Sequence, residues 1–253
     1  DDALSLFIVA DGMGGHKGGE TASRMVASLI RSFLAQRADG EGLDPEEPPD
    51  VALSPHANRL LAAIRFANAA VHRESQEHAH LSGMGSTLAA VWLTDNTFIA
   101  ANVGDSPIYL IHRGEIEVLS VTHTVAAEAP LLLDGAAGQV ADSALGQMLT
   151  RGMGIGPTVQ ADVCEGPCFP GDRLVLCSDG LSSKLTPSEI LGHVAAASSQ
   201  EACRRLVDLA NARGGDDNIS VIVIRIASMG RRLQRLMAAL GRVLPGAGLR
   251  RPI

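Results

Sequence analysis

The feature that most constrains this chain is the segment from Phe7 to His16, where an apolar run ends on an acidic residue and a cluster of glycines. The run Phe7–Ala10 has the composition of a buried strand, and Asp11 follows it directly. Three of the next four residues are glycines, which turn tightly and let backbone carbonyls approach a ligand. The segment therefore holds a carboxylate at the rim of a sheet, where it either forms a turn or binds a hard cation.

Composition limits the classes of protein to consider. The 253 residues are 46% apolar, enough for one domain with a substantial core. There is no run of 18 apolar residues and no basic leader, so we expect neither a membrane span nor a signal peptide. The four cysteines lack zinc-ligand spacing, and Cys177 lies in an apolar run, as a core thiol does. We therefore expect a cytoplasmic protein.

Charge is unevenly distributed along the chain. The net charge is −7, but residues 228–253 carry six arginines and no acid, so the other 227 residues carry −13. An acidic body argues against nucleic acid as the partner and suits a cation site.

Hydrophobic periodicity predicts helices over residues 20–37 and 56–80. Capping boxes that begin at Thr186 and Ser198 predict two more, the second ending near Gly214. The second helix carries His72, His78 and His80, which we interpret as facing solvent because they lack the spacing of a zinc-protease helix.

Short apolar runs with turn-forming pairs between them predict the strands. Four of them form an expected antiparallel meander, over 86–93, 97–103, 107–112 and 115–119. Further strands are expected at 157–163, 172–177 and 219–226, the last buried on both faces. Residues 38–55 read as a solvated loop, and 120–156 as a binding loop or flap. The segregated blocks predict an α+β fold in which helix layers cover a largely antiparallel sheet system.

Asp11 has counterparts later in the chain. Asp179 and the pair Asp216/Asp217 also lie where an apolar strand meets a glycine-bearing turn. Each alone is typical of a turn aspartate. If their strands are neighbours, however, the acids converge and their repulsion needs cations to offset it. Oxygen ligands without paired Cys or His favour Mg²⁺ or Mn²⁺, and two such ions suit hydrolysis of a phosphate ester.

An ordered set of motifs extends this pattern over most of the chain. They are Phe7–His16 with Glu20–Ser23, Gly85–Leu88, Ala101–Ser106, Thr122-His123, Leu149–Gly154, Gly171–Leu174, Cys177–Leu181 and Gly215–Asn218. Together they resemble the metal-dependent Ser/Thr protein phosphatases, the PPM or type 2C family, in its bacterial branch. The resemblance implies a sandwich of two antiparallel β-sheets flanked by pairs of antiparallel helices.

The resemblance also implies roles for particular residues. Asp11 resembles the carboxylate that bridges two Mn²⁺ or Mg²⁺ ions, and Gly12 would offer its carbonyl to one of them. Asp179 and Asp217 would complete the other ion's ligands, and with Asp11 they are the implied catalytic residues. Asp105 resembles the ligand of a third, weaker ion of bacterial members, although a hairpin turn also explains it. Asp216 is left outside the ligand set.

The implied reaction is in-line attack of a metal-activated water on phosphorus, without a phosphoenzyme. Met13 stands where animal members carry a histidine proposed as the general acid. His16 and His123 are alternative candidates, and we interpret each as a structural hydrogen-bonding residue.

The amino-terminal segment departs from the family pattern. Family members begin with an Arg-x-x-Asn-Glu/Gln-Asp stretch and a strand, whereas here only six residues precede Phe7. Three explanations stay open: truncation, which we favour; substitution by Asp1 or Asp2; and loss of catalysis in a pseudophosphatase.

The expected domains are a catalytic domain over 1–227 and a basic amphipathic tail over 228–253. The tail either contacts a membrane surface or a partner, or packs back on the acidic body.

We expect a monomer that removes phosphate from phosphoserine and phosphothreonine in proteins and opposes a Ser/Thr kinase. The alternatives are a catalytically impaired regulatory binding module and, less favoured, a stress-response phosphatase of the anti-anti-sigma type.

Overall fold

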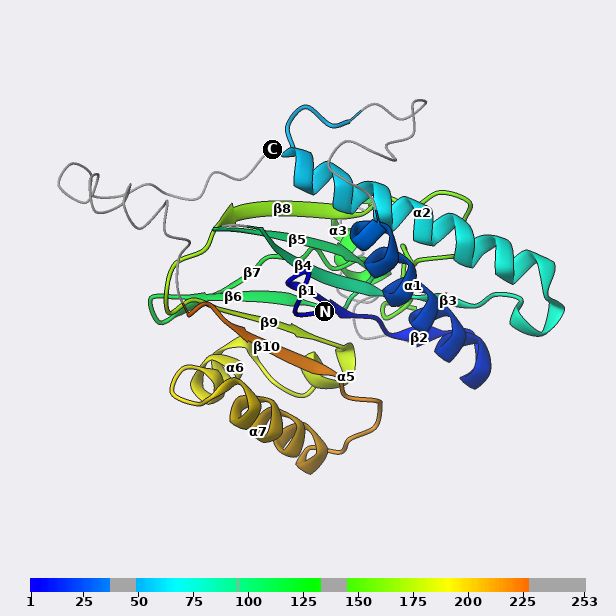
Figure 1. Ribbon diagram of the computed structural model, residues 1–253. Helices are drawn as coiled ribbons and strands as arrows, with labels where there is room; N and C mark the ends of the chain where they lie inside the picture. Colours follow the sequence, from blue (N-terminus) through cyan, green and yellow to red (C-terminus); the bar gives the residue numbers. More distant parts are fainter. Residues whose placement is uncertain (37–48, 95, 133–144, 228–253) are drawn as a thin grey trace.

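The computed structural model describes residues 1–36, 49–94, 96–132 and 145–227, and for residues 16 and 129–132 it describes the backbone alone. The predicted tail 228–253 lies outside these residues, as does most of the predicted loop 38–55. The described chain forms two four-stranded antiparallel sheets stacked face to face, with helices on both outer faces (Figure 1).

The first sheet has the strand order β1-β4-β5-β8. Its strands are β1 (Leu6–Val9), β4 (Leu88–Thr94), β5 (Thr97–Val103) and β8 (Asp162–Pro167). Helices α1 (His16–Gln36) and α2 (Pro55–Glu77) cover its outer face, and a short 3-10 helix, η1 (Ala79–Leu81), follows α2. The two predicted helices are therefore confirmed. The α2 helix begins at Pro55 because the Ser54 hydroxyl accepts from the Ala57 amide as an N-cap.

The second sheet has the order β10-β9-β6-β7. Its strands are β6 (Ile108–His112), β7 (Glu115–Val118), β9 (Arg173–Cys177) and β10 (Val221–Arg225). Helices α6 (Pro187–Val194) and α7 (Ser199–Ala212) cover it. The capping box predicted at Thr186 is complete, and Ser198 caps α7. The shorter elements are β2 (Gly12–Met13), β3 (Gly85–Ser86), α3 (Val125–Leu132) and α5 (Asp179–Ser182).

Three apolar layers hold the sandwich together. One lies between α1, α2 and the first sheet, one between the two sheets, and one between the second sheet and α6 and α7. Strand β10 is apolar from Val221 to Ile224 because both of its faces are covered: Ile224 faces the layer between the sheets, and Val223 faces the helices. The predicted sandwich and the packing of this strand on both faces are confirmed.

Two strand predictions were wrong. The segment 86–119 is not one meander, because β4 and β5 pair in the first sheet whereas β6 and β7 pair in the second. The chain crosses between the sheets at Gly104–Pro107, where a hairpin turn was expected. The strand predicted at 157–163 is β8, which begins at Asp162 because its ladder with β5 runs from Asn102↔Asp162 to Thr97↔Pro167.

The pairing brings one end of each sheet together. In the first sheet β1 and β5 both pair antiparallel with β4, so they run parallel and end at the same edge. In the second sheet Cys177, which ends β9, pairs with Val221, which begins β10. The crossover from β5 to β6 joins these two edges. The chain therefore brings Asp11, Asp105, Asp179 and Asp217 to one end of the sandwich.

Candidate metal centre

Asp11 is held by backbone and hydroxyl contacts from the start of β4. The Asp11 amide donates to Thr87 Oγ1 (3.0 Å), and the Thr87 amide donates to the Asp11 carbonyl (2.7 Å). Thr87 Oγ1 also lies 2.7 Å from Ser106 Oγ, next to Asp105, in a buried hydroxyl pair. One short network thus joins the turns that carry Asp11 and Asp105.

The Gly12 turn packs tightly on the first helix. A Cβ atom at Gly12 would lie 2.0 Å from the carbonyl oxygen of Gly19, so no larger residue fits this approach of β2 to α1. The Gly12 carbonyl oxygen itself lies against the backbone of Gly19. Its predicted role as a metal ligand stays a prediction.

Asp179 and Asp217 are brought together by a second backbone contact. Ser178 Oγ donates to the Asn218 carbonyl (3.1 Å) and accepts from the Ser220 amide (3.0 Å). A Cβ atom at Gly180 would lie 2.4 Å from the same Asn218 oxygen. The turn after β9 therefore rests on the loop before β10, with an acidic residue on each.

Burial and the neighbouring charges raise the pKa of two of the acids, Asp11 and Asp105. The pKa of Asp11 is raised to about 7, first by burial and then by the charge of Asp179 and a hydrogen bond with it; Asp217 and Asp105 add to the shift. The pKa of Asp105 is raised to about 6, chiefly by burial and then by Asp179, against a lowering by its own backbone amide. Because a cation would reverse these costs, the arrangement fits a metal site.

The donor set also fits hard cations. Asp179 Oδ1 is buried without a hydrogen-bond partner, an unusual state for a carboxylate oxygen. All four predicted side chains offer oxygen, which Mg²⁺ and Mn²⁺ prefer. Within the described residues, Asp11 and Asp179 form the close pair, and Asp105 and Asp217 act on it electrostatically.

A different group has its ligand atoms within 4.8 Å of one another: Glu74, Glu77 and His78, at the exposed end of α2. It includes none of the predicted ligands. His78 and His80 are exposed as predicted, whereas half-buried His72 contacts the Gly154 carbonyl.

Other candidates take structural positions. His123 is fully buried and bonded through both ring nitrogens, as expected of a structural hydrogen-bonding residue. Burial is the main cause that lowers its pKa. The side chain of His16 lies outside the described residues.

Two other acidic residues form ion pairs away from the candidate ligands. Asp1 lies 2.6 Å from Arg31, and Asp216 pairs with Lys184 at the surface.

Sequence reasoning missed Asp162 and Glu128, which join His123 and Arg151 in a polar network beside the site. Neither lies in a quoted motif, and the spacing of the chain gives no signal that they meet.

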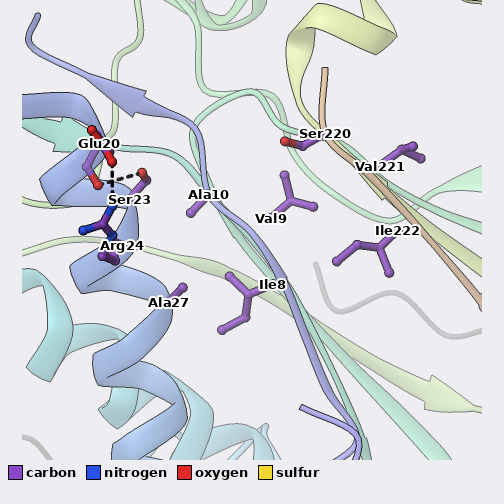
Figure 2. Close-up of a pocket in the computed structure, with 10 residues that line it drawn as sticks. All are labelled: Ile8, Val9, Ala10, Glu20, Ser23, Arg24, Ala27, Ser220, Val221 and Ile222. Atoms are coloured by element: carbon purple, nitrogen blue, oxygen red, sulfur yellow. Dashed lines mark hydrogen bonds and ion pairs between the residues drawn. The ribbon is translucent and has the colours of Figure 1, made fainter. Parts of the chain in front are cut away.

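A groove of about 520 Å³ is lined by helix α1, by β1 and the residue after it, and by the start of β10 (Figure 2). Ile8, Val9 and Ala10 lie between the side chains of α1 on one side and Ser220–Ile222 on the other. The α1 residues that line the groove are Glu20, Ser23, Arg24 and Ala27. Its charged lining residues within the described chain, Glu20 and Arg24, pair with each other. The groove therefore offers apolar surface beside β1 and β10, which are outer strands of the two sheets in the described part of the chain.

Comparison with protein families matches residues 1–219 to the family described as Protein phosphatase 2C. The serine/threonine protein phosphatase PstP of Mycobacterium tuberculosis is 32% identical over 222 residues, which are 86% of this chain and 40% of that protein. The chain thus spans less than half the length of this relative. A protein of Streptococcus pyogenes named putative protein phosphatase 2C-type is 31% identical over 87% of this chain and 85% of its own length.

Solved structures agree with these matches. The crystal structure of PstP/Ppp from Mycobacterium tuberculosis superposes with a TM-score of 0.73 at 28% identity, covering 88% of this chain and 89% of that one. The PstP catalytic domain in complex with two manganese ions gives a TM-score of 0.71 at 27% identity, covering 88% of each chain. Among the described residues, no helix is long and apolar enough to cross a membrane.

Proposed function

Because the chain belongs to the protein phosphatase 2C family, we propose that it is a metal-dependent phosphatase that hydrolyses phosphoserine and phosphothreonine in proteins. The observation that carries the proposal is the Asp11–Asp179 pair, where a buried carboxylate oxygen lacks a partner beside an acid whose pKa is about 7. Such a pair is costly in the protein alone and favourable around cations.

Each site residue has a proposed role. Asp11 and Asp179, with Asp217, would hold two Mn²⁺ or Mg²⁺ ions, and Asp105 a third. The Gly12 carbonyl is kept as a further candidate ligand. The manganese ions of the related PstP catalytic domain support this choice of metal. Bound ions would supply activation of water and neutralise the charge on the phosphoryl oxygens.

Hydroxyl side chains supply the positioning. Thr87 fixes Asp11 relative to Ser106, and Ser178 fixes Asp179 relative to Asn218. These contacts come from both sheets, so the ligands are held at fixed separations before substrate binds.

The wider context is also part of the proposal. The substrates would be phosphorylated proteins, produced by a cognate Ser/Thr kinase. The four free cysteines are consistent with a cytoplasmic location. Monomeric state, the boundary at residue 227 and a membrane or partner role of the tail remain predictions.

The test is hydrolysis of p-nitrophenyl phosphate and of a phosphothreonine peptide, with Mn²⁺ titrated against EDTA. We expect turnover that requires metal and is lost in Asp179→Asn. Asp216→Asn is the matched control because Asp216 is exposed and pairs with Lys184. If folded protein binds Mn²⁺ without turnover, the chain is a binding module; if it binds none, the metal proposal is wrong.

A further inference from the structure

His123 holds both backbone groups of Gly104, the residue before Asp105. The Gly104 amide donates to His123 Nδ1 (3.0 Å), and the His123 amide donates to the Gly104 carbonyl (3.1 Å). The imidazole is fully buried, so water does not compete for these bonds. The backbone and the side chain of His123 therefore both hold the turn that carries Asp105.

Neighbouring contacts make the turn rigid. Two residues earlier, the Asn102 amide group donates to the Val121 carbonyl (2.6 Å) and accepts from the Val121 amide (3.1 Å). Gly104 adopts φ of 97°, and a Cβ atom there would lie 2.9 Å from the Thr87 side chain. The end of β5 is thus fixed between residues 121–123 on one side and Thr87 on the other.

The other ring nitrogen of His123 faces a charged pair. Since Nδ1 accepts from Gly104, the ring proton lies on Nε2, which donates to Asp162 Oδ2 (2.7 Å). The same oxygen accepts from Arg151 Nη1 (2.8 Å). A carboxylate that orients a buried imidazole is the arrangement used around metal sites to fix the groups behind the ligands.

Two further contacts surround this charged pair. Arg151 Nη2 lies 3.5 Å from Glu128 Oε1 on α3, and the Thr150 amide donates to the His123 carbonyl (3.0 Å). Glu128 and Thr150 therefore each contact a residue of the network around His123.

We propose that His123 is a positioning residue of the metal centre: its imidazole, clamped between Gly104 and the Asp162–Arg151 pair, fixes the carboxylate of Asp105 for cation binding. The inference rests on the proposed function, because it takes Asp105 to be a metal ligand. It adds a role for His123, Asp162 and Arg151, none of which is a predicted metal ligand.

Two substitutions separate the two halves of the clamp. In His123→Asn the side-chain oxygen replaces Nδ1 and can still accept from Gly104. In His123→Gln the terminal amide replaces Nε2 and can still donate to Asp162. The control is His112→Ala, which breaks a second histidine–aspartate bond of 2.7 Å, to Asp172, at the opposite end of the second sheet.

The measurement is calorimetric titration of Mn²⁺ into the EDTA-stripped full chain, with thermal unfolding of each variant measured in parallel. We compare the titration of the unchanged protein with that of Asp105→Asn. The part of the Mn²⁺ binding that is absent in Asp105→Asn is the component that depends on Asp105. We expect His123→Gln to weaken this component roughly tenfold to a hundredfold. His123→Asn, which keeps the bond to Gly104 and loses the one to Asp162, should weaken it by less than His123→Gln. The His112→Ala control should keep it within about threefold, and all variants should stay folded at the temperature of titration.

Three results would overturn the inference in different ways. If His123→Gln binds Mn²⁺ like the unchanged protein while Asp105→Asn does not, His123 is merely structural. If His112→Ala weakens binding equally, the effect follows general destabilisation. If Asp105→Asn binds Mn²⁺ like the unchanged protein, or if the unchanged protein binds no Mn²⁺, the proposed metal role of Asp105 is wrong. The inference about His123 is then wrong as well, because it depends on that role.

Discussion

A Cβ atom at Gly180 would lie 2.4 Å from the carbonyl oxygen of Asn218, so the turn that carries Asp179 rests directly on the loop that carries Asp217. The two acids belong to segments 38 residues apart in sequence, and this backbone contact sets their separation. Only glycine fits at position 180, because the Cβ atom of any other residue would have to displace the backbone of Asn218.

Replacing Gly180 by alanine should therefore move the two acidic turns apart. We expect Gly180→Ala to destabilise the fold by roughly 1–3 kcal/mol, the usual cost of overpacking, and to weaken Mn²⁺ binding. Urea unfolding and calorimetric titration check the two effects. Gly192→Ala is the control, since a Cβ atom there meets nothing within 4 Å in helix α6, and alanine should stabilise by about 0.5–1 kcal/mol. Equal Mn²⁺ affinity in both variants would refute the positioning role of this contact.

Removing the charge of Asp179 should separate stability from metal binding. In Asp179→Asn the new amide can donate to Asp11, and the charge that raises the pKa of Asp11 is gone. We expect the metal-free variant to be more stable than the parent at pH 8, while Mn²⁺ no longer raises its melting temperature. Differential scanning calorimetry with EDTA or with Mn²⁺ measures both. A variant less stable than the parent in EDTA would show that the Asp11–Asp179 pair is not under electrostatic strain.

Sequence reasoning predicted the convergence of the acids for a physical reason that the structure bears out. Asp11 and Asp179 each follow a strand whose apolar residues require burial, and these strand ends lie at the same end of the sandwich. Asp105 was placed in the site by the family resemblance alone, and Asp216, which the pattern included, pairs with Lys184 at the surface. The pattern of strand, acid and glycine is local, so it is readable without the fold.

The crossover at Gly104–Pro107 was not readable in the same way. Gly104-Asp105 has the composition of a hairpin turn, and the choice between pairing β6 with β5 or with β9 depends on distant strands. Likewise Asp162 meets His123 only because β8 pairs with β5, a contact between residues 39 apart. Local patterns do not encode such partners.

Proton binding should compete with metal binding in this site. The pKa values of Asp11 and Asp105, about 7 and about 6, lie above the ordinary value, so the folded state keeps protons that the unfolded chain releases. These two groups therefore make the metal-free protein less stable as pH rises from about 4 to about 7. Mn²⁺ replaces the protons, so its affinity should fall as pH decreases below about 7.

The measurement compares the parent with Asp11→Asn, because other groups also titrate in this range. The difference in unfolding free energy between the two, in EDTA, should change in favour of Asp11→Asn as pH rises from 4 to 7. Mn²⁺ titrations of the parent at pH 6 and 7.5 give the second readout. A difference that is constant with pH would mean that Asp11 ionises normally.

Asp172 is a buried carboxylate that has a structural role, in contrast to the candidate metal ligand Asp179. It is 3% exposed, accepts from the Phe169 amide (2.8 Å) and lies 2.7 Å from His112 Nδ1. Strand β9 separates it from Asp179 by seven residues, roughly 20 Å of extended chain.

Asp172→Ala should cost roughly 1–3 kcal/mol of stability because it leaves the Phe169 amide unpaired. Its Mn²⁺ affinity should equal that of the parent, in contrast to Asp179→Asn. Urea unfolding and calorimetric titration test both statements, and weakened metal binding in a folded Asp172→Ala variant would show that the two ends of β9 are coupled.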